Sequence, residues 1–304
     1  MLSIIVCSRN SSLSKSFSNN IKITVGVEYE LICIDNSKNA YSISQAYNEG
    51  KLISKFNYLC FVHEDVTFHT QNWGEKVITH LNVPNTGIIG LAGGDAAFNV
   101  LYDYGTLNRS MNIIHVDKKG IEPIEVELMP KNYSMPTRSV VLLDGVILCA
   151  KRELFNGISF DESFGGFHGY DYDISIQSIV AGYYNYVMYN VSLTHYSKGL
   201  FDAVFYKSII KVFDKWKNCL PLFEHSISID EQKRLSAIYE KRSINKLLKK
   251  LIRTKTESKD IVEIYSFYMK VIGSKKDIYL LNIIKMRILL IYMLSVFRKK
   301  IITK

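Results

Sequence analysis

The sequence predicts an α/β fold, in which helices cover both faces of a mostly parallel sheet, followed by a helical C-terminal region. Three observations predict it. Short apolar runs alternate with helix-like segments, several of those runs end in polar residues, and basic residues gather towards the C-terminus. Hydrophobic residues make up 47% of the 304 residues and charged residues 22%, so the chain can bury a sizeable core.

The first hundred residues alternate β-rich apolar runs with segments of helical character. The predicted strands cover residues 2–7, 30–34, 58–62 and 87–91, and the predicted helices cover 42–50, with Ser42 or Ser44 as N-cap, and 73–81. A polar, serine-rich stretch (10–20) connects the first two strands. The sequence contains neither GxGxxG nor GxxxxGK[ST], so a dinucleotide-binding fold or a P-loop has no local support.

The strand at 58–62 ends abruptly in His63-Glu64-Asp65. Three consecutive polar side chains are costly at the end of a buried strand unless something there uses them. Ligands bind at the carboxyl ends of strands in open α/β sheets, so this stretch is either a solvated turn or a site for a metal and a diphosphate.

The pattern loosens from residue 93 to 138, which indicates an antiparallel or loop-rich insertion. The segment 140–149 is strongly apolar apart from Asp144. Buried acids are rare without a partner or a role, whereas an Asp-Gly pair is also typical of a turn between two strands. Both interpretations stay open for Asp144.

A glycine-rich loop then leads to a helix predicted at 174–181, with His168, Asp171 and Asp173 near its start. Acids in a first helical turn often only complement the helix dipole, but here a histidine and aromatic residues accompany them. A strand predicted at 186–193 is followed by His195, and a solitary histidine is most often structural.

Taken together, these motifs resemble those of the family 2 glycosyltransferases of GT-A fold. The motifs are Ser8-Arg9, Ile34-Asp35-Asn36-Ser37, AYNEG at 46–50, the HED triplet, GGFHGYDYDI at 165–174 and THYSKG at 194–199. Within that family the chain is similar to a bacterial branch that carries HxD in place of DxD. The resemblance covers about residues 1–200 and depends on the order of the motifs at successive strand ends.

The resemblance implies transfer of a sugar from a nucleoside-diphosphate sugar to an acceptor hydroxyl, in the synthesis of a bacterial surface polysaccharide. It implies roles for individual positions: Ser8, Arg9 and Asp35 for the nucleoside, Asn48 and His63 beside the donor, Asp65 and His195 at the metal, Asp171 as general base, and Asp144 and His168 on the acceptor side. His63 replaces an acid of the usual triplet, and Tyr170 stands where relatives often have Glu.

The expected chemistry is consistent with these roles. A diphosphate leaving group requires a hard divalent cation, Mn²⁺ or Mg²⁺, and an imidazole ligand favours Mn²⁺. The attacking hydroxyl must lose a proton to a single carboxylate, which predicts inversion at the anomeric carbon with Asp171 as base. Asp173 is the alternative base, but its spacing at the start of a helix predicts that it points elsewhere.

The five cysteines form no CxxC pair, and four of them lie in apolar strand-like runs. We expect buried free thiols in a reducing compartment rather than disulfides or a zinc site. Because the sequence starts almost directly with a strand and shows no secretory leader, we expect a cytoplasmic protein.

The charge of the chain is unevenly distributed. Residues 225–304 contain 19 Lys and Arg against 7 Asp and Glu, a net charge of +12, whereas residues 1–224 have a net charge of −3. We therefore predict a catalytic domain (1–202) and a basic, mostly helical region (203–304), with helical periodicity at 203–218, 234–253 and 261–272. The expected partners are the nucleotide-sugar donor, a glycan or lipid-linked glycan acceptor and an anionic membrane surface at the inner face of the plasma membrane.

The segment 278–297 is nearly apolar and long enough to span a bilayer, but Lys285 and Arg287 interrupt it. It could pack on neighbouring helices or a second copy of the chain, lie on a membrane surface, or span the membrane. Its interspersed cations favour the first two arrangements.

Three other functions stay open from the sequence. A nucleotidyltransferase would usually show a glycine-rich first loop, which is absent after Ser8-Arg9-Asn10. A nucleic-acid-binding protein could use the basic region, but its cations are interleaved with Ile and Leu and no nucleic-acid motif is present. A noncatalytic nucleotide-sugar-binding protein is the third.

Overall fold

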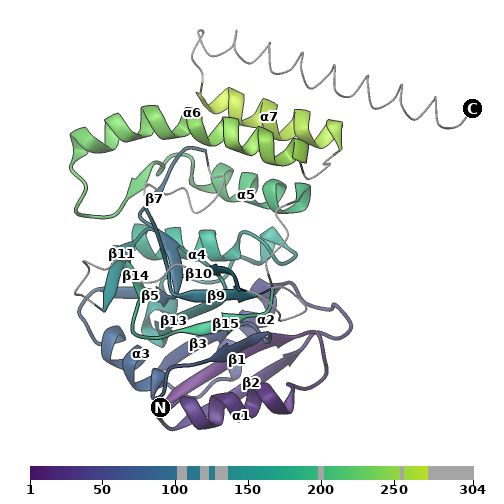
Figure 1. Cartoon of the computed structure of the whole chain (residues 1–304), viewed down its shortest axis with the longest axis vertical. Coiled ribbons are helices and arrows are strands. Elements are labelled where there is room, and N and C mark those ends of the chain that lie inside the picture. The colour runs from purple at the N-terminus through teal and green to yellow at the C-terminus, as the bar shows by residue number, and fades with distance from the viewer. Residues whose placement is uncertain (101–107, 117–122, 127–135, 198–201, 254–256, 273–304) are drawn as a thin grey trace, which may run out of the picture.

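The computed structural model describes residues 1–100, 108–116, 123–126, 136–197, 202–253 and 257–272. Figure 1 shows an α/β body with further helices stacked on one side of it. The α/β fold class predicted from the sequence is confirmed.

The central sheet has seven strands in the order β11-β14-β5-β13-β3-β1-β2. These strands are β1 (Leu2–Ser8), β2 (Tyr29–Asp35), β3 (Tyr58–Val62), β5 (Thr86–Gly90), β11 (Thr137–Val140), β13 (Ile147–Lys151) and β14 (Tyr184–Met188). Both β13 and β11 run antiparallel to their neighbours, whereas the other five strands share one direction. The sheet is therefore mostly parallel, as predicted.

Alternate residues of the central strands face two different helical layers. Leu2, Ile4 and Val6 pack with buried residues of α1 (Lys15–Thr24) and α3 (Trp73–Leu81). Ile5 of the same strand packs instead with α2 (Ile43–Ile53) and α4 (Tyr170–Val180). This period of two is what a strand covered on both faces requires.

Two of these helices begin with side-chain caps. Ser14 accepts a hydrogen bond from the amide of Phe17 at the start of α1, and Ser42 forms a capping box with Gln45 at the start of α2. The cap at Ser42 confirms one of the two predicted N-caps. The sequence did not predict α1, because its apolar residues Phe17 and Ile21 are spaced within a mostly polar stretch.

Three smaller sheets accompany the central one among the described residues. One has the order β10-β9-β15-β4, another β12-β6-β8, and a third pairs β16 with β7. These strands are β4 (Val66–Phe68), β6 (Ala92–Gly94), β7 (Ala96–Ala97), β8 (Arg109–Met111), β9 (Ile113–Val116), β10 (Pro123–Val126), β12 (Leu142–Leu143), β15 (Leu193–His195) and β16 (Leu222–Phe223). The predicted antiparallel insertion is therefore present.

Two apolar segments are each divided in the structure. The segment at 140–149 contains β12 and β13 with Asp144 in the turn between them, so the predicted Asp-Gly turn is present, and the role expected of Asp144 stays a prediction. The single strand predicted at 186–193 was wrong, because β14 joins the central sheet whereas β15 pairs with β4 and β9.

The helices α5 (Ala203–Trp216), α6 (Ile229–Arg253) and α7 (Ser258–Ile272) confirm the three helical periodicities. Their buried residues share one apolar cluster with Tyr172 and Ile176 of α4. Among the described residues, no helix combines the length and apolar content needed to cross a bilayer. The segment 278–297 lies outside the described residues.

All five cysteines are free, as predicted, but only Cys60 and Cys149, neighbours on β3 and β13, are buried. Cys7 and Cys33 are half-buried and Cys219 is exposed, so the expectation of burial was wrong for Cys219.

Candidate functional site

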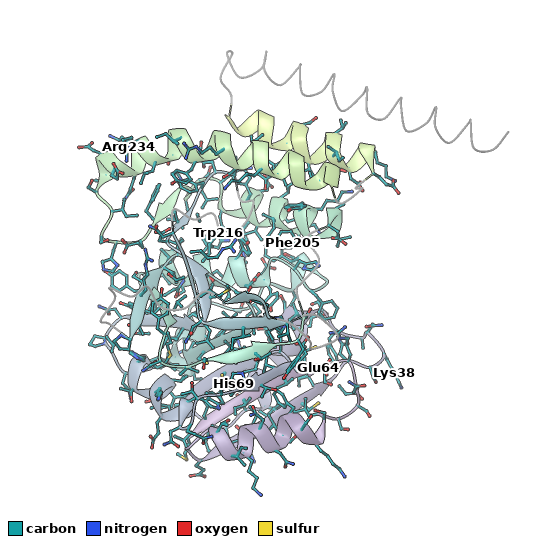
Figure 2. The ribbon with its side chains drawn as sticks, in the orientation of Figure 1. Lys38, Glu64, His69, Phe205, Trp216 and Arg234 are labelled. Carbon is teal, nitrogen blue, oxygen red and sulfur yellow. The ribbon has the colours of Figure 1, made fainter. Side chains whose placement is uncertain are left out.

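The carboxyl ends of β1, β2 and β3 lie side by side at one edge of the central sheet. Ser8 is in register with Asp35 on the neighbouring strand. Glu64, just beyond β3, accepts a hydrogen bond from the Ser8 hydroxyl at 2.6 Å and one from the Arg9 amide at 3.2 Å. Figure 2 shows Glu64 at this edge of the body, on the same side as Lys38. The predicted nucleoside residues Ser8, Arg9 and Asp35 are therefore brought together.

The second part of the site joins the end of β3 to β15. Pairing of β4 with β15 places His195 opposite Val66, and the amide of Tyr196 donates a hydrogen bond to the carbonyl of Asp65 at 3.0 Å. Side-chain ligand atoms of His63, Asp65 and His195 all lie within 4.8 Å of one another. His195 Nε2 is 3.2 Å from Asp65 Oδ1, and the His63 and His195 rings are 5.4 Å apart.

These three side chains fit a divalent cation. His195 is only 6% exposed; its Nε2 faces the Asp65 carboxylate, and its Nδ1 has no hydrogen-bond partner among the described residues. Burial raises the pKa of the Asp65 carboxyl, but the neighbouring His195 outweighs burial and leaves that pKa below its ordinary value. Burial, with His195 nearby, lowers the pKa of His63 to about 4, so His63 is a neutral imidazole at neutral pH. One carboxylate and two imidazoles are ligands that Mn²⁺ and other first-row cations accept.

The predicted base, Asp171, lies in the first turn of α4. Its Oδ2 accepts a hydrogen bond from the Gly145 amide at 3.2 Å, in the turn that also contains Asp144. Burial and the charge of Asp144 raise the pKa of Asp171 to about 7. A carboxylate with this pKa can accept a proton near neutral pH. The preceding residue, Tyr170, contacts His63 Nε2 through its hydroxyl at 3.0 Å. The start of α4 therefore lies against the group of His63, Asp65 and His195, called the metal-type cluster below.

A family model described as "Glycosyltransferase like family" matches residues 3–215 of this chain. That match covers more than half of the sequence. The chain belongs to this glycosyltransferase-like family. The family predicted from the motifs is confirmed, and membership supports a glycosyl transfer function.

Other comparisons add little to this assignment. No curated protein shows significant sequence similarity to this chain. One similar solved structure is GalNAc-T7 with UDP, GalNAc and Mn²⁺, at 12% identity and a TM-score of 0.46, covering 66% of this chain and 43% of that one. Another is A197 from STIV, at 13% identity and a TM-score of 0.39, covering 65% of this chain and 86% of that one. Both scores are low, so neither likeness bears on the chemistry.

Three candidate residues lie outside the cluster of His63, Asp65 and His195. Asn48 donates hydrogen bonds to Phe160 and Glu162, and it lines a polar pocket of about 290 Å³ between α2 and α5 residues. His168 packs against Phe205 of α5, with the two rings 5.5 Å apart. Asp173 is fully buried and turned towards α5, in agreement with the expectation that it points away from the base. The roles expected of Asn48 and His168 stay predictions.

Sequence reasoning gave no role to three residues that the structure brings to the site. They are Glu64, which anchors Ser8 and Arg9; Tyr170, which contacts His63; and His115, whose ring lies 5.3 Å from that of His195. Glu64 and Tyr170 stood inside recognised motifs, so their positions were a usable signal. His115 joins the site only because β9 pairs in parallel with β15, and that pairing leaves no local pattern in the sequence.

Proposed function

We propose that this chain is an inverting, metal-dependent glycosyltransferase that moves a sugar from a nucleoside-diphosphate sugar to an acceptor hydroxyl. The observation that carries the proposal is the convergence of three distant segments. The end of β3 supplies His63 and Asp65, β15 supplies His195, and the start of α4 supplies Asp171 beside Tyr170. We further propose that the acceptor is a glycan or lipid-linked glycan of a bacterial surface polysaccharide.

In this proposal Asp171 is the general base. A single carboxylate that removes the proton of the attacking hydroxyl supports direct displacement, which inverts the anomeric carbon. The raised pKa of Asp171, about 7, suits this task because the carboxylate is both available and basic at neutral pH. Asp144, in the adjacent turn, and His168 are proposed to face the acceptor.

Asp65 and His195 are proposed to hold Mn²⁺ or Mg²⁺. When bound, the cation would neutralise the charge that develops on the departing diphosphate. Ser8, Arg9 and Asp35 are proposed to hold the nucleoside at the neighbouring strand ends, where Glu64 orders the Ser8-Arg9 backbone. Asn48 and His63 are proposed to lie on the donor side.

We also propose that the protein is cytoplasmic and rests on an anionic membrane surface through α6. Arg234, Ile238, Arg242 and Lys246 recur at every fourth position of α6, and all four are exposed. The opposite side of the helix buries Ile244, Leu247 and Leu251 in the apolar cluster. Among the acids of α6, Glu231 pairs with Arg234 near the start of the helix, whereas Glu240 faces the body and accepts a hydrogen bond from Asn99. An amphipathic helix whose outward face carries cations and an exposed Ile suits contact with lipid headgroups.

The direct test of sugar transfer uses a panel of nucleoside-diphosphate sugars with Mn²⁺. We expect one donor to raise the thermal unfolding midpoint and to release its nucleotide diphosphate, slowly without an acceptor. Asp65→Asn should reduce that release at least about 100-fold, because it removes the only charged ligand proposed for the cation. Asp214→Asn, an exposed acid of α5, is the control and should leave the rate unchanged. Donor binding without turnover in any acceptor extract would instead support a noncatalytic nucleotide-sugar-binding protein.

A further inference from the structure

The hydroxyl of Tyr170 lies between two polar groups at the edge of the metal-type cluster. It is 3.0 Å from His63 Nε2 and 3.1 Å from the carbonyl oxygen of Gly145, to which it donates. Tyr170 itself is only 5% exposed, so water does not readily substitute for either partner.

The proton count at this hydroxyl fixes the roles of its partners. A carbonyl oxygen can only accept, so the single Tyr170 proton is used on Gly145. Towards His63 the hydroxyl oxygen must therefore accept, which requires a proton on His63 Nε2. A neutral imidazole carries one proton, so the lone pair of His63 lies on Nδ1.

We propose that Tyr170 is a positioning residue that fixes His63 as the Nε2–H tautomer, so that His63 offers Nδ1 to the cation shared with Asp65 and His195. This inference depends on the part of the proposed function in which Asp65 and His195 bind a divalent cation. Residues that hold the far nitrogen of a metal-binding histidine commonly set both the orientation and the basicity of the ligand.

The packing around Tyr170 leaves its hydroxyl little freedom. A Cβ built on Gly145 would lie 2.0 Å from the Tyr170 oxygen, so only glycine allows this close approach. On the other side, the Tyr47 ring meets the Tyr170 ring edge-on at 5.8 Å. The amide of the same Gly145 donates to Asp171, so one turn orients both the predicted base and the tyrosine that holds His63.

The test reads the tautomer first and metal affinity second, and neither measurement requires turnover. In the metal-free full chain, nitrogen-15 NMR of the His63 ring should show the Nε2–H tautomer in the wild type and a mixture in Tyr170→Phe. Titration calorimetry should show Mn²⁺ binding weakened about 10- to 100-fold in Tyr170→Phe. Tyr184→Phe is the matched control, because it removes a tyrosine hydroxyl whose ring packs against His225, at a ring distance of 4.8 Å, rather than against Tyr170. It should keep the wild-type tautomer and affinity.

A wild-type His63 with its proton on Nδ1 would overturn the inference even if the protein binds Mn²⁺ and transfers sugar. Unchanged Mn²⁺ affinity in a folded Tyr170→Phe variant would overturn it as well. A wild type that binds no Mn²⁺ would overturn the proposal that this site holds a cation, together with the ligand role of His63. The tautomer spectrum separates these cases, because it is recorded without metal.

Discussion

Asp171 illustrates how one side chain can be tuned by its surroundings. Burial and the negative charge of Asp144 raise its pKa to about 7 from an ordinary value of 3.8. We expect the rate of transfer at low substrate to rise about tenfold per pH unit below pH 7 and to level off above it, since only the ionised carboxylate accepts a proton. Asp144→Asn should move the midpoint of this profile to lower pH. A profile with the same midpoint in both proteins would contradict the assignment of Asp171 as base.

The same shift has a consequence for stability. Between about pH 4 and pH 7 folded Asp171 binds more protons than unfolded Asp171, so its contribution to stability falls as the pH rises through this window. Above pH 7 the buried charge destabilises the fold by an amount on the order of 4 kcal/mol. Asp171→Asn should therefore abolish transfer and yet unfold at higher urea concentration than the wild type at pH 8, with little gain at pH 4. If the wild type and Asp171→Asn had the same free energy of unfolding at both pH values, Asp171 would not carry a buried charge in the folded protein.

The resemblance of the motifs to a known family allowed Asp171, Asp65 and His195 to be selected, whereas the cost of polar residues at the end of a buried strand pointed only to the triplet that contains Asp65. It could not reveal that Tyr170 contacts His63, or that His115 lies beside His195, because both contacts depend on register between strands and helices far apart in the chain. The order of the motifs along the chain indicated which residues belong to the site, but it did not indicate which of those residues contact one another.

At the scale of elements, the clearest case is the connection between α4 and α5. Asp173 is fully buried, and its Oδ1 lies 2.8 Å from Lys215 Nζ and 2.7 Å from Trp216 Nε1. Lys215 also contacts Asp161 at 2.7 Å. Figure 2 shows Trp216 between α4 and the helices beyond it. The C-terminal region is thus bonded to the helix that begins with the predicted base.

Removal of this lysine charge should leave Asp173 buried without a cation. We expect Lys215→Met to lower the free energy of unfolding by about 2–4 kcal/mol, because an uncompensated buried carboxylate is strongly unfavourable. Urea denaturation followed by fluorescence would measure the loss. The control is Lys217→Met, whose ion pair with Asp214 is on the surface and should change stability little. A loss as small in Lys215→Met as in the control would show that the pair is not structural.

Helices with a strong apolar face were predictable, including α3 and the three C-terminal helices. The helix α1 was not, because it buries little besides Phe17 and Ile21, and its Ser14 cap is one serine among several. The split of the apolar run at 186–193 into β14 and β15 was hidden for a different reason. Strands of two sheets follow each other closely there, and a run of apolar residues does not tell which sheet each part joins.

At the scale of the whole molecule, charge separates the α/β body from the helices stacked on it. Figure 2 shows Arg234 on α6, at the end of the molecule opposite α1. The exposed cations Arg234, Arg242 and Lys246 follow one line along that helix. Composition alone predicted the basic region, but only the helical register shows which of its cations share a face.

Charge reversal tests the proposed membrane contact. Each cation near an anionic surface contributes about 1 kcal/mol, so the triple variant R234E, R242E, K246E should reduce binding to phosphatidylserine vesicles by at least about 100-fold at low salt. The matched control K15E, K22E, K55E makes the same change of net charge on exposed residues of the body. It should bind more strongly than the α6 variant in co-sedimentation. Equal binding of the two variants, or binding that ignores salt, would rule out the α6 face.

The bonding of Asp173 to Lys215 and Trp216 also constrains how this protein could be recombined. A chimera that joined residues 1–202 to the C-terminal region of a relative would keep buried Asp173 but lose Lys215 and Trp216, which pair with it. If the relative's C-terminal region lacked either group at the matching position, buried Asp173 would lose a partner, only two residues from the predicted base. Exchange of acceptor or membrane preference by swapping halves therefore needs its junction beyond Trp216, so that α5 travels with the body.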